Sequence, residues 1–440
     1  MEERDILNSC VPDWVDEKKK INEVLFCTEF LKDHPMISIN DAFFTVNGRV
    51  FDESQLRKTI YNRIKPYVTS GIAKKVGNLL EVMRMECCEG ELPMYLDRIH
   101  VANGTVFLDG SFSEEKDFCR NRLPVAYNPD APVPEKWLEF LDQLLNPGDI
   151  LTLQEFMGYC FIPSNKGQKM LLLTGRGGEG KSRIGIVLRA LLGSNMKSGS
   201  LAKVETSPFA RADLEHVLAM VDDDMKMEAL TQTNNIKAIV TAEIPMDLEK
   251  KSQQSYQGDL RVRFLAFGNG TLQALHDRSV GFFRRQIILS VKERDPDRKD
   301  DPFLAEKLCS EAEGIFLWAL EGLQRLIRND YKFTLSTQAE ENMAAAVAEG
   351  NNLVEFMKSE GYFRFKADHE VSSRDFYEVY QLWCQDNAVN AFTAKTFWTH
   401  LKQNAAVYNL EYTNNVHIGG GKRVRGFWGI ELLQRPGFGY

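Results

Sequence analysis

The chain has 440 residues, of which 43% are hydrophobic and 26% are charged, a balance that excludes a largely disordered or fibrous protein. Because single hydrophobic cores stop growing at roughly 250–300 residues, this length predicts more than one domain. The formal net charge of −8 has the wrong sign for a protein that coats DNA through its overall field, so any contact with nucleic acid is expected to be local.

No apolar run approaches the ~18 residues that span a bilayer, and the N-terminal residues lack the layout of a signal peptide. We therefore expect a soluble, intracellular protein with no membrane partner. The eight cysteines are scattered without a Cys-x-x-Cys pair, so neither a zinc ribbon nor a disulfide framework is expected.

Residues 1–124 mix helical stretches with Asn-Gly and Asp-Gly turns, which predicts a mixed α/β N-terminal region. A proline-rich passage follows, and its prolines disfavour a continuous helix or a central strand. From residue 135 to 161 apolar residues recur at helical spacing, with a break at Asn146-Pro147-Gly148, so two packed helices are predicted. We assign residues 125–162 to a helical linker.

The helical spacing of apolar residues ends before residues 170–173, which form a continuous apolar run typical of a strand buried on both faces. Further strands are predicted at residues 217–221, 262–267 and 286–291, with helical stretches before or between them. Because alternating strands and helices favour a parallel sheet, we expect an α/β core over residues 163–335.

The segment Gly175-Arg176-Gly177-Gly178-Glu179-Gly180-Lys181-Ser182 fits G-x-x-x-x-G-K-S and lies between a predicted strand and a predicted helix. Its glycines let backbone N–H groups converge on phosphate oxygens. Lys181 is expected to reach the β- and γ-phosphates of ATP, and Ser182 to ligate Mg²⁺. A glycine-rich turn without a ligand is the alternative, which the flanking strand and helix disfavour.

The predicted strand at residues 217–221 runs into Asp222-Asp223-Asp224, and a strand that ends in acids suits a second magnesium-and-water site. We assign Asp222 to magnesium and Asp223 to the attacking water, with Asp224 as a spare and a shift of one residue left open. A solvated acidic turn is the alternative, and the distance from the glycine-rich loop favours the functional interpretation.

Two polar features accompany the next strands. Asn269 stands between two glycines, where its amide is placed to orient the lytic water, although such an Asn is also a common turn former. Arg284 and Arg285 precede the last strand, and either is a candidate finger that reaches a neighbouring subunit's nucleotide. Surface arginines that merely flank a strand are the alternative.

This ordered set of motifs resembles the superfamily 3 helicases, specifically the helicase part of phage, plasmid and poxvirus-type primase-helicases. The resemblance implies a P-loop, AAA+-like ATPase core that forms a homo-hexamer and unwinds DNA with ATP and Mg²⁺. By this resemblance Lys181 and Ser182 are the Walker A pair, Asp222 and Asp223 Walker B, Asn269 the sensor, and Arg284 or Arg285 the finger. Glu179 departs from the family, which commonly has Asn there.

The same resemblance implies partners and a setting. A DNA-tracking basic hairpin between Walker B and the sensor points to Lys250 and Lys251, with a solvated charge run equally open. Single-stranded and forked DNA are the implied substrates, in phage or plasmid replication in the cytoplasm of a bacterial or phage-infected cell. Because the N-terminal region has no convincing Asp-x-Asp metal site, priming is expected from a separate protein.

Residues 350–440 are expected to form a small DNA-binding domain. Helices are predicted at 353–357, 372–387 and 393–404, followed by a strand at 407–412 and a hairpin that turns at Gly419-Gly420-Gly421. This order resembles a winged helix, whose third helix would be the recognition element. The basic residues expected to face phosphates are Lys395, Lys402, Lys422, Arg423 and Arg425. A winged helix that binds protein is the alternative.

The leading hypothesis is therefore an ATP-driven DNA helicase. A P-loop nucleotide switch or small-molecule kinase is the second, and an ATP-dependent origin-binding protein without unwinding activity is the third. Stimulation of hydrolysis by single-stranded DNA separates them, because a small-molecule kinase has no reason to respond.

Overall fold

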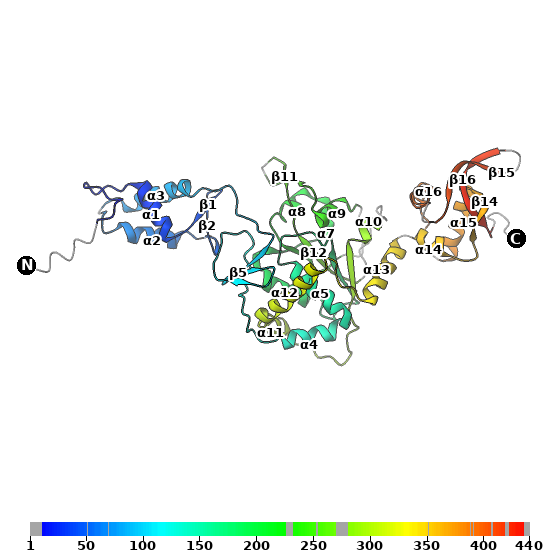
Figure 1. Cartoon of the computed structure of the whole chain (residues 1–440), viewed down its shortest axis with the longest axis horizontal. Helices are drawn as coiled ribbons and strands as arrows, with labels where there is room; N and C mark the ends of the chain where they lie inside the picture. Colours follow the sequence, from blue (N-terminus) through cyan, green and yellow to red (C-terminus); the bar gives the residue numbers. More distant parts are fainter. Residues whose placement is uncertain are drawn as a thin grey trace, which may run out of the picture. The chain divides into compact units, whose positions relative to one another are not determined.

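The computed structural model describes residues 11–50, 52–68, 70–225, 232–251, 254–269, 280–350, 352–387, 389, 391–405, 408–418 and 422–434. The chain divides into two compact units (Figure 1). The first unit comprises residues 1–272 and 285–339, and the second comprises residues 273–284 and 340–440.

The N-terminal part of the first unit combines helices with small antiparallel sheets. Its helices are α1 (Glu23–Asp33), α2 (Ser54–Ile64) and α3 (Ile72–Glu86). One sheet consists of β1 (Ile37–Ile39), β2 (Ala42–Thr45) and β3 (Gly48–Arg49), and the other of β4 (Arg98–Val101), β5 (Gly104–Phe107) and β6 (Phe112–Ser113). Trp14, Phe26 and Phe30 pack in the core between the helices.

A five-stranded parallel sheet forms the centre of the first unit, in the order β13-β7-β12-β9-β8. Its strands are β7 (Met170–Thr174), β8 (Met196–Ser198), β9 (Ala219–Asp222), β12 (Arg263–Gly268) and β13 (Gln286–Ser290). The predicted parallel sheet and four of its strands are confirmed. The edge strand β8 was not predicted, because two of its three residues are exposed and give no apolar pattern.

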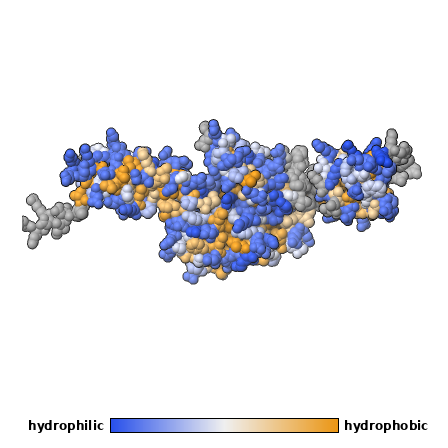
Figure 2. All heavy atoms as spheres, turned by 45° about the horizontal axis from the view of Figure 1, so that its top comes forward, coloured by the Kyte–Doolittle hydropathy of each residue, from blue (hydrophilic) through white to orange (hydrophobic). Residues whose placement is uncertain are grey.

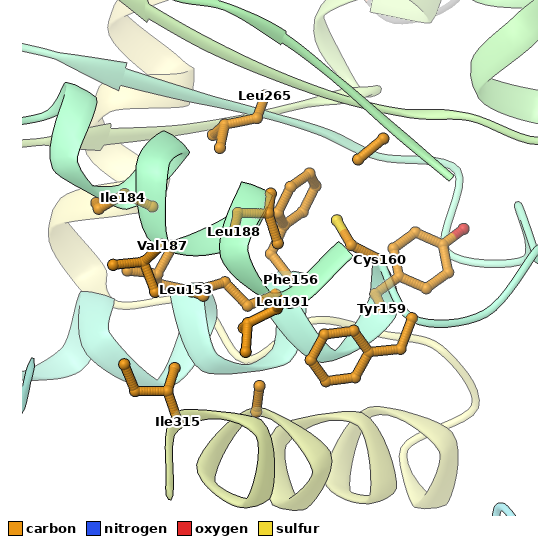
Figure 3. Close-up of a cluster of buried hydrophobic side chains, with 14 of the residues drawn as sticks. Leu153, Phe156, Tyr159, Cys160, Ile184, Val187, Leu188, Leu191, Leu265 and Ile315 are labelled. Carbon is orange, nitrogen blue, oxygen red and sulfur yellow. The ribbon is translucent and has the colours of Figure 1, made fainter. Parts of the chain in front are cut away.

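Helices pack around this sheet: α4 (Glu135–Leu144), α5 (Pro147–Tyr159), α6 (Ser182–Leu192), α11 (Leu304–Cys309) and α12 (Ala312–Arg328). Helix α6 carries apolar residues at the spacing that keeps one face buried. Figure 3 shows where these side chains meet: Ile184, Val187, Leu188 and Leu191 of α6 with Leu153 and Phe156 of α5. Helices α5 and α12 approach so closely that a Cβ at Gly158 would collide with the carbonyl oxygen of Ala319.

Shorter elements complete the first unit. They are a 3₁₀ turn (Gly193–Asn195), α7 (Leu201–Thr206), α8 (Pro208–Ala212), α9 (Asn234–Thr241), and the antiparallel pair β10 (Met246–Leu248) and β11 (Tyr256–Gly258). Helix α10 (Val280–Phe283), which precedes β13 in the chain, belongs to the second unit.

The second unit alternates helices with a three-stranded antiparallel sheet. After α13 (Thr337–Gly350) come α14 (Asn352–Lys358), β14 (Phe363–Ser372), α15 (Ser373–Asp386), α16 (Ala394–Gln403), β15 (Glu411–Ile418) and β16 (Lys422–Leu432). The sheet order is β14-β16-β15. In the core, Tyr380 stacks on Phe397 and meets Phe356 edge to face. Strand β14 was not predicted, because half of its ten residues are exposed and its run of charged and polar residues leaves no apolar pattern. The predicted hairpin turn at residues 419–421 lies outside the described residues.

Hydrophilic residues cover much of the face shown in Figure 2, with apolar residues scattered among them. Within the described ranges, no helix has both the length and the apolar character needed to cross a membrane.

Candidate functional site

The glycine-rich loop, residues 175–182, connects strand β7 to helix α6. Gly177, Gly178 and Gly180 have φ angles of 110°, 83° and 105°, in the left-handed region that glycine adopts without strain. Turns of this kind arrange successive N–H groups into a concave anion-binding surface, to which the following helix adds its positive end. The loop therefore has the local geometry of an anion site.

A buried ion pair lies within this loop. The Nζ atom of Lys181 lies 2.7 Å from Oε2 of Glu179, and the two side chains are only 8% and 5% exposed. The other carboxylate oxygen of Glu179 accepts a hydrogen bond of 2.8 Å from the N–H of Gly177. Burial alone raises the pKa of the Glu179 carboxyl, but the hydrogen bonds from Lys181 and from backbone N–H groups outweigh it and hold the pKa below its usual value. The carboxylate thus takes the contacts that an anionic ligand would make.

A cavity of about 640 Å³ opens beside the loop, at the carboxyl ends of the parallel strands. Its lining includes residues 177–183 of the loop and α6, together with Asp223, Asp224 and Asn269. After β7 the chain passes through α6 to β8, at one edge of the sheet. After β12 it goes in the opposite direction, past β7, to β13 at the other edge. A crevice where successive connections diverge in this way is the usual ligand site of an open α/β sheet.

The strand register determines which carboxylates reach this cavity. Asp222 pairs with Ala266, two residues before the end of β12, whereas Gly268 pairs with Thr174 at the end of β7. The residues that come level with the glycine-rich loop are therefore Asp223 and Asp224, and both line the cavity.

Asp222 has a different environment from Asp223 and Asp224, and its assignment to magnesium stays a prediction. Its side chain is buried, and Oδ2 accepts a hydrogen bond of 2.8 Å from the N–H of Leu201. Burial raises the pKa of the Asp222 carboxyl. A buried carboxylate that accepts a hydrogen bond from the backbone suits a structural role. The geometry therefore favours the alternative that the sequence left open, in which the magnesium and water roles shift by one residue to Asp223 and Asp224.

The predicted sensor Asn269 and the finger candidate Arg285 lie at different edges of the sheet. Asn269 directly follows β12 and lines the cavity. Gly270, the next residue, lies outside the described residues. Arg285 directly precedes β13, so it lies at the amino edge of the sheet, opposite the glycine-rich loop of its own chain. Arg284 is exposed and belongs to the second unit.

Lys250 and Lys251 follow β10 in the antiparallel pair β10–β11. Nζ of Lys250 lies 2.6 Å from Oε2 of Glu215, which also accepts a hydrogen bond of 2.7 Å from the hydroxyl of Tyr256. Lys250 is therefore tied to Glu215 and, through it, to Tyr256 of β11, whereas Lys251 is exposed.

The basic residues predicted in the second unit lie on two elements. Lys395 and Lys402 are exposed on α16, and Nζ of Lys402 lies 3.8 Å from the centre of the Tyr412 ring. Arg423 and Arg425 are exposed on β16, which begins at Lys422.

Two arginines that the sequence analysis missed contact the outside of the glycine-rich loop. Nη1 of Arg298 donates a hydrogen bond of 2.9 Å to the carbonyl oxygen of Glu179, and Nη1 of Arg294 donates one of 3.4 Å to that of Gly178. Both arginines also line the cavity. They belong to no motif, and only the fold brings them to the loop.

In the part of the chain that the structure describes, no group of three or more His, Cys, Asp or Glu side chains could hold a metal by itself. A magnesium ion that arrives with a nucleotide needs fewer protein ligands, because phosphate oxygens and water complete its shell. The Ser182 hydroxyl and the Asp223 and Asp224 carboxylates, all on the cavity wall, fit that requirement.

Comparisons with known proteins support the fold and leave the activity open. Residues 173–285 match the sequence profile of DUF5906, a family of unknown function. The apo structure of the NrS-1 C-terminal region (305–718) is similar over 93% of this chain and 100% of that chain, with a TM-score of 0.54 and 11% identity. An A-form apo structure of the same region is similar over 91% and 97% of the two chains, with a TM-score of 0.51 and 12% identity. A comparison with curated protein sequences finds no match.

Proposed function

We propose that this protein is an ATP-driven DNA helicase of the superfamily 3 type, with a P-loop ATPase core and a winged-helix DNA-binding domain. The observation that carries the proposal is the convergence of the glycine-rich loop, two strand-end carboxylates and an amide on one cavity at the divergence point of a parallel sheet. Each of these groups has a defined task in phosphoryl transfer.

In this proposal the loop N–H groups and Lys181 hold the β- and γ-phosphates of ATP. Mg²⁺, when bound, neutralises charge on the phosphate oxygens. The carboxylates of Asp223 and Asp224 would hold Mg²⁺ and accept a hydrogen bond from the attacking water. Asn269 donates its amide N–H to the γ-phosphate or orients that water.

The position of Arg285 supports action between subunits. A residue at the amino edge of the sheet is remote from the glycine-rich loop of its own chain, so its guanidinium acts on a nucleotide only when another subunit supplies that nucleotide. A ring of six copies would bring each amino edge to a neighbour's cavity. Arg284 and Arg285 are both candidates for this finger.

Contact with DNA is proposed for two sets of residues. The exposed Lys251 extends from the β10–β11 pair, which Lys250 braces through Glu215. In the second unit, the order α14, β14, α15, α16, β15, β16 supports the proposed winged helix. Its third helix, α16, would enter the major groove while Arg423 and Arg425 of the β15–β16 wing contact phosphates.

The test is strand displacement on forked DNA, with ATP hydrolysis measured in parallel with and without single-stranded DNA. We expect wild-type protein to unwind the fork only with ATP and to hydrolyse ATP faster when single-stranded DNA is present. Lys181→Ala should lose both activities, and its folding is verified by circular dichroism, because the substitution leaves the buried Glu179 carboxylate without its partner. Hydrolysis by Lys181→Ala at the wild-type rate would refute the role of the glycine-rich loop.

The Glu179–Lys181 pair favours a second candidate, a nucleotide-gated DNA-binding switch. A loop that holds its own carboxylate in the anion site suits a protein whose loop must rearrange before it binds nucleotide. This candidate predicts ATP-dependent DNA binding without strand displacement, so the same forked substrate separates it from the helicase.

A further inference from the structure

A second cavity of the first unit, about 720 Å³ in volume, shares no residue with the cavity beside the glycine-rich loop. Part of its lining comes from the segment 91–96, which belongs to no helix or strand. Another part comes from Arg120 and from residues 215 and 216, and the rest from β11 and residues near it in the chain. Strand β11 lies at the outside of the first unit (Figure 1). We call this space the β11 cavity.

Strand β11 borders the cavity with a free edge. In the part of the chain that the structure describes, β11 pairs with β10 alone. Residues 256–258 of β11 and the following Asp259 line the cavity, whereas no residue of β10 does. The backbone N–H and C=O groups along an unpaired strand edge readily form hydrogen bonds with another extended chain. An extended peptide in the β11 cavity would therefore continue the β10–β11 sheet.

The walls of the β11 cavity are tied together before any ligand binds. The N–H of Arg120 donates a hydrogen bond of 3.1 Å to the carbonyl oxygen of Pro93, which holds the segment 91–96 in place. Nδ2 of Asn121 donates one of 2.8 Å to the carbonyl oxygen of His216. A site whose walls are already fixed loses less conformational entropy on binding than a site that has to form.

Arg120 is a largely buried cation in this lining, with hydrogen-bond donors to spare. Its side chain is 15% exposed, and Nη2 lies 3.2 Å from Oε2 of Glu91, which is itself 80% exposed. Among the described residues, Nε and Nη1 of Arg120 have no hydrogen-bond partner. Burial lowers the pKa of the Arg120 guanidinium, and the attraction of Glu91 and Glu215 is too weak to reverse this. The guanidinium therefore favours a further anionic partner, such as a carboxylate.

The other charges in the lining favour a single carboxylate over a chain of phosphates. Three acids, Glu91, Glu215 and Asp259, outnumber the two arginines, Arg120 and Arg261. A DNA strand carries a charge on every nucleotide and would be repelled by these acids, whereas a peptide can present one acidic side chain to Arg120. Much of the remaining lining is apolar and comprises Leu92, Pro93, Met94, Leu96 and Pro245.

We propose that the β11 cavity binds an extended peptide of a partner protein. The peptide pairs with β11 as an added strand, places an acidic side chain against Arg120 and an apolar side chain against Leu96. A volume within the ~300–1,000 Å³ range of enclosed ligand sites suits a short peptide segment rather than a folded domain. Because Lys251 extends from the same β10–β11 pair, the partner would hold the element proposed to contact DNA. This inference goes beyond the proposed function, since neither ATP nor DNA occupies the β11 cavity.

The experiment selects binders of the full wild-type chain from random heptapeptides displayed on phage, then measures the enriched peptides by fluorescence anisotropy. We expect these peptides to combine an acidic with an apolar residue. Arg120→Gln should weaken their binding about 10- to 100-fold, the range of hydrogen bonds to a charged group. Leu96→Ala should weaken it about tenfold, and it is expected to fold because Leu96 is 48% exposed. Leu151→Ala is the matched control, since Leu151 is 42% exposed and does not line the cavity.

Strand addition has a control of its own. N-methylation of alternate backbone amides removes the N–H donors along one edge of the peptide and leaves its side chains intact. Methylation of the edge that faces β11 should weaken binding roughly 2- to 10-fold for each hydrogen bond lost. Equal affinities of the unmodified peptide and of the peptides methylated on either edge would overturn strand addition.

Two further outcomes would overturn the peptide site. One is the absence of any enriched peptide whose binding depends on Arg120 or Leu96. The other is displacement of the peptide by an oligothymidylate that itself binds Arg120→Gln and Leu96→Ala more weakly, because this result would assign the β11 cavity to single-stranded DNA. These measurements require neither ATP hydrolysis nor strand displacement, so they are independent of the test of the proposed function.

Discussion

Substitution of Glu179 by glutamine tests the state of the glycine-rich loop directly. The side chain is nearly isosteric, so Oε1 can still accept the hydrogen bond from the Gly177 N–H. The atom that faces Lys181 changes from a charged oxygen acceptor to an uncharged NH₂ group, so the ion pair is lost. We expect this variant to bind ATP more tightly than the wild type, because the Lys181 ammonium no longer has to leave an internal partner.

The magnitude follows from the geometry of the pair. Two unit charges 2.7 Å apart attract by about 6 kcal/mol at an effective dielectric constant of ~20. The cost of removing both groups from water cancels much of this, and hydrogen bonds to charged groups are worth about 1.5–3 kcal/mol net. Freeing Lys181 should therefore tighten ATP binding by about 10- to 100-fold. Without nucleotide the variant should also be less stable, since Lys181 then lies largely buried without its partner.

The assay is titration of a fluorescent ATP analogue, with thermal unfolding measured with and without ATP. Glu293→Gln is the control, because Glu293 pairs with Arg176 of the same loop at 2.9 Å but both side chains are well exposed, at 74% and 84%. This control should leave affinity unchanged, since exposed ion pairs contribute little. Affinity of Glu179→Gln that equals or falls below that of the wild type would refute the view that the carboxylate competes with the ligand.

Three further predictions concern other parts of the chain. Arg298→Ala should weaken the binding of both ATP and tripolyphosphate, because the Glu179 peptide group loses the donor that turns its carbonyl outward. Lys299→Ala, at an exposed neighbouring residue, should leave both affinities unchanged. Calorimetry that finds equal affinities for Arg298→Ala and the wild type would contradict this. Burial, reinforced by nearby Arg122, lowers the pKa of His100 to about 4, so the unfolded chain takes up this proton first and wild-type stability should fall as pH drops from ~6.5 toward 4. His100→Gln should lack that component in urea unfolding at several pH values, and identical pH profiles would disprove it. Replacing Arg423 and Arg425 by alanine should weaken DNA binding and reduce the salt slope by about two in fluorescence anisotropy, and an unchanged slope would argue against phosphate contacts.

The sequence predicted those parts of the fold that leave a local pattern. Four strands of the central sheet are buried on both faces, so they appear in the sequence as apolar runs. The loop after β7 is recognisable from its glycines and Lys181. Strands β8 and β14 left no such pattern, because their side chains largely face solvent. Their formation depends on partners distant in the sequence, which a local pattern does not report.

The same distinction applies to the candidate site. Asp222, Asp223 and Asp224 are chemically equivalent in the sequence, and only the pairing of Asp222 with Ala266 determines which of them reach the cavity. Arg294 and Arg298 follow no recognisable spacing, and their hydrogen bonds to the glycine-rich loop depend on the path of the chain after β13. The sequence showed that Glu179 is an unusual residue for this loop, but it did not show that Glu179 pairs with Lys181.

The position of β7 in the sheet has a consequence for biosynthesis. Both of its hydrogen-bonding partners, β12 and β13, are translated after it, so the apolar stretch Met170–Thr174 emerges from the ribosome long before either neighbour exists. Unpaired apolar strands are prone to self-association, and pairings between distant segments form slowly. Fragments that end before Gln286 should therefore be insoluble, and slower growth at low temperature or added chaperones should improve the yield of the full chain.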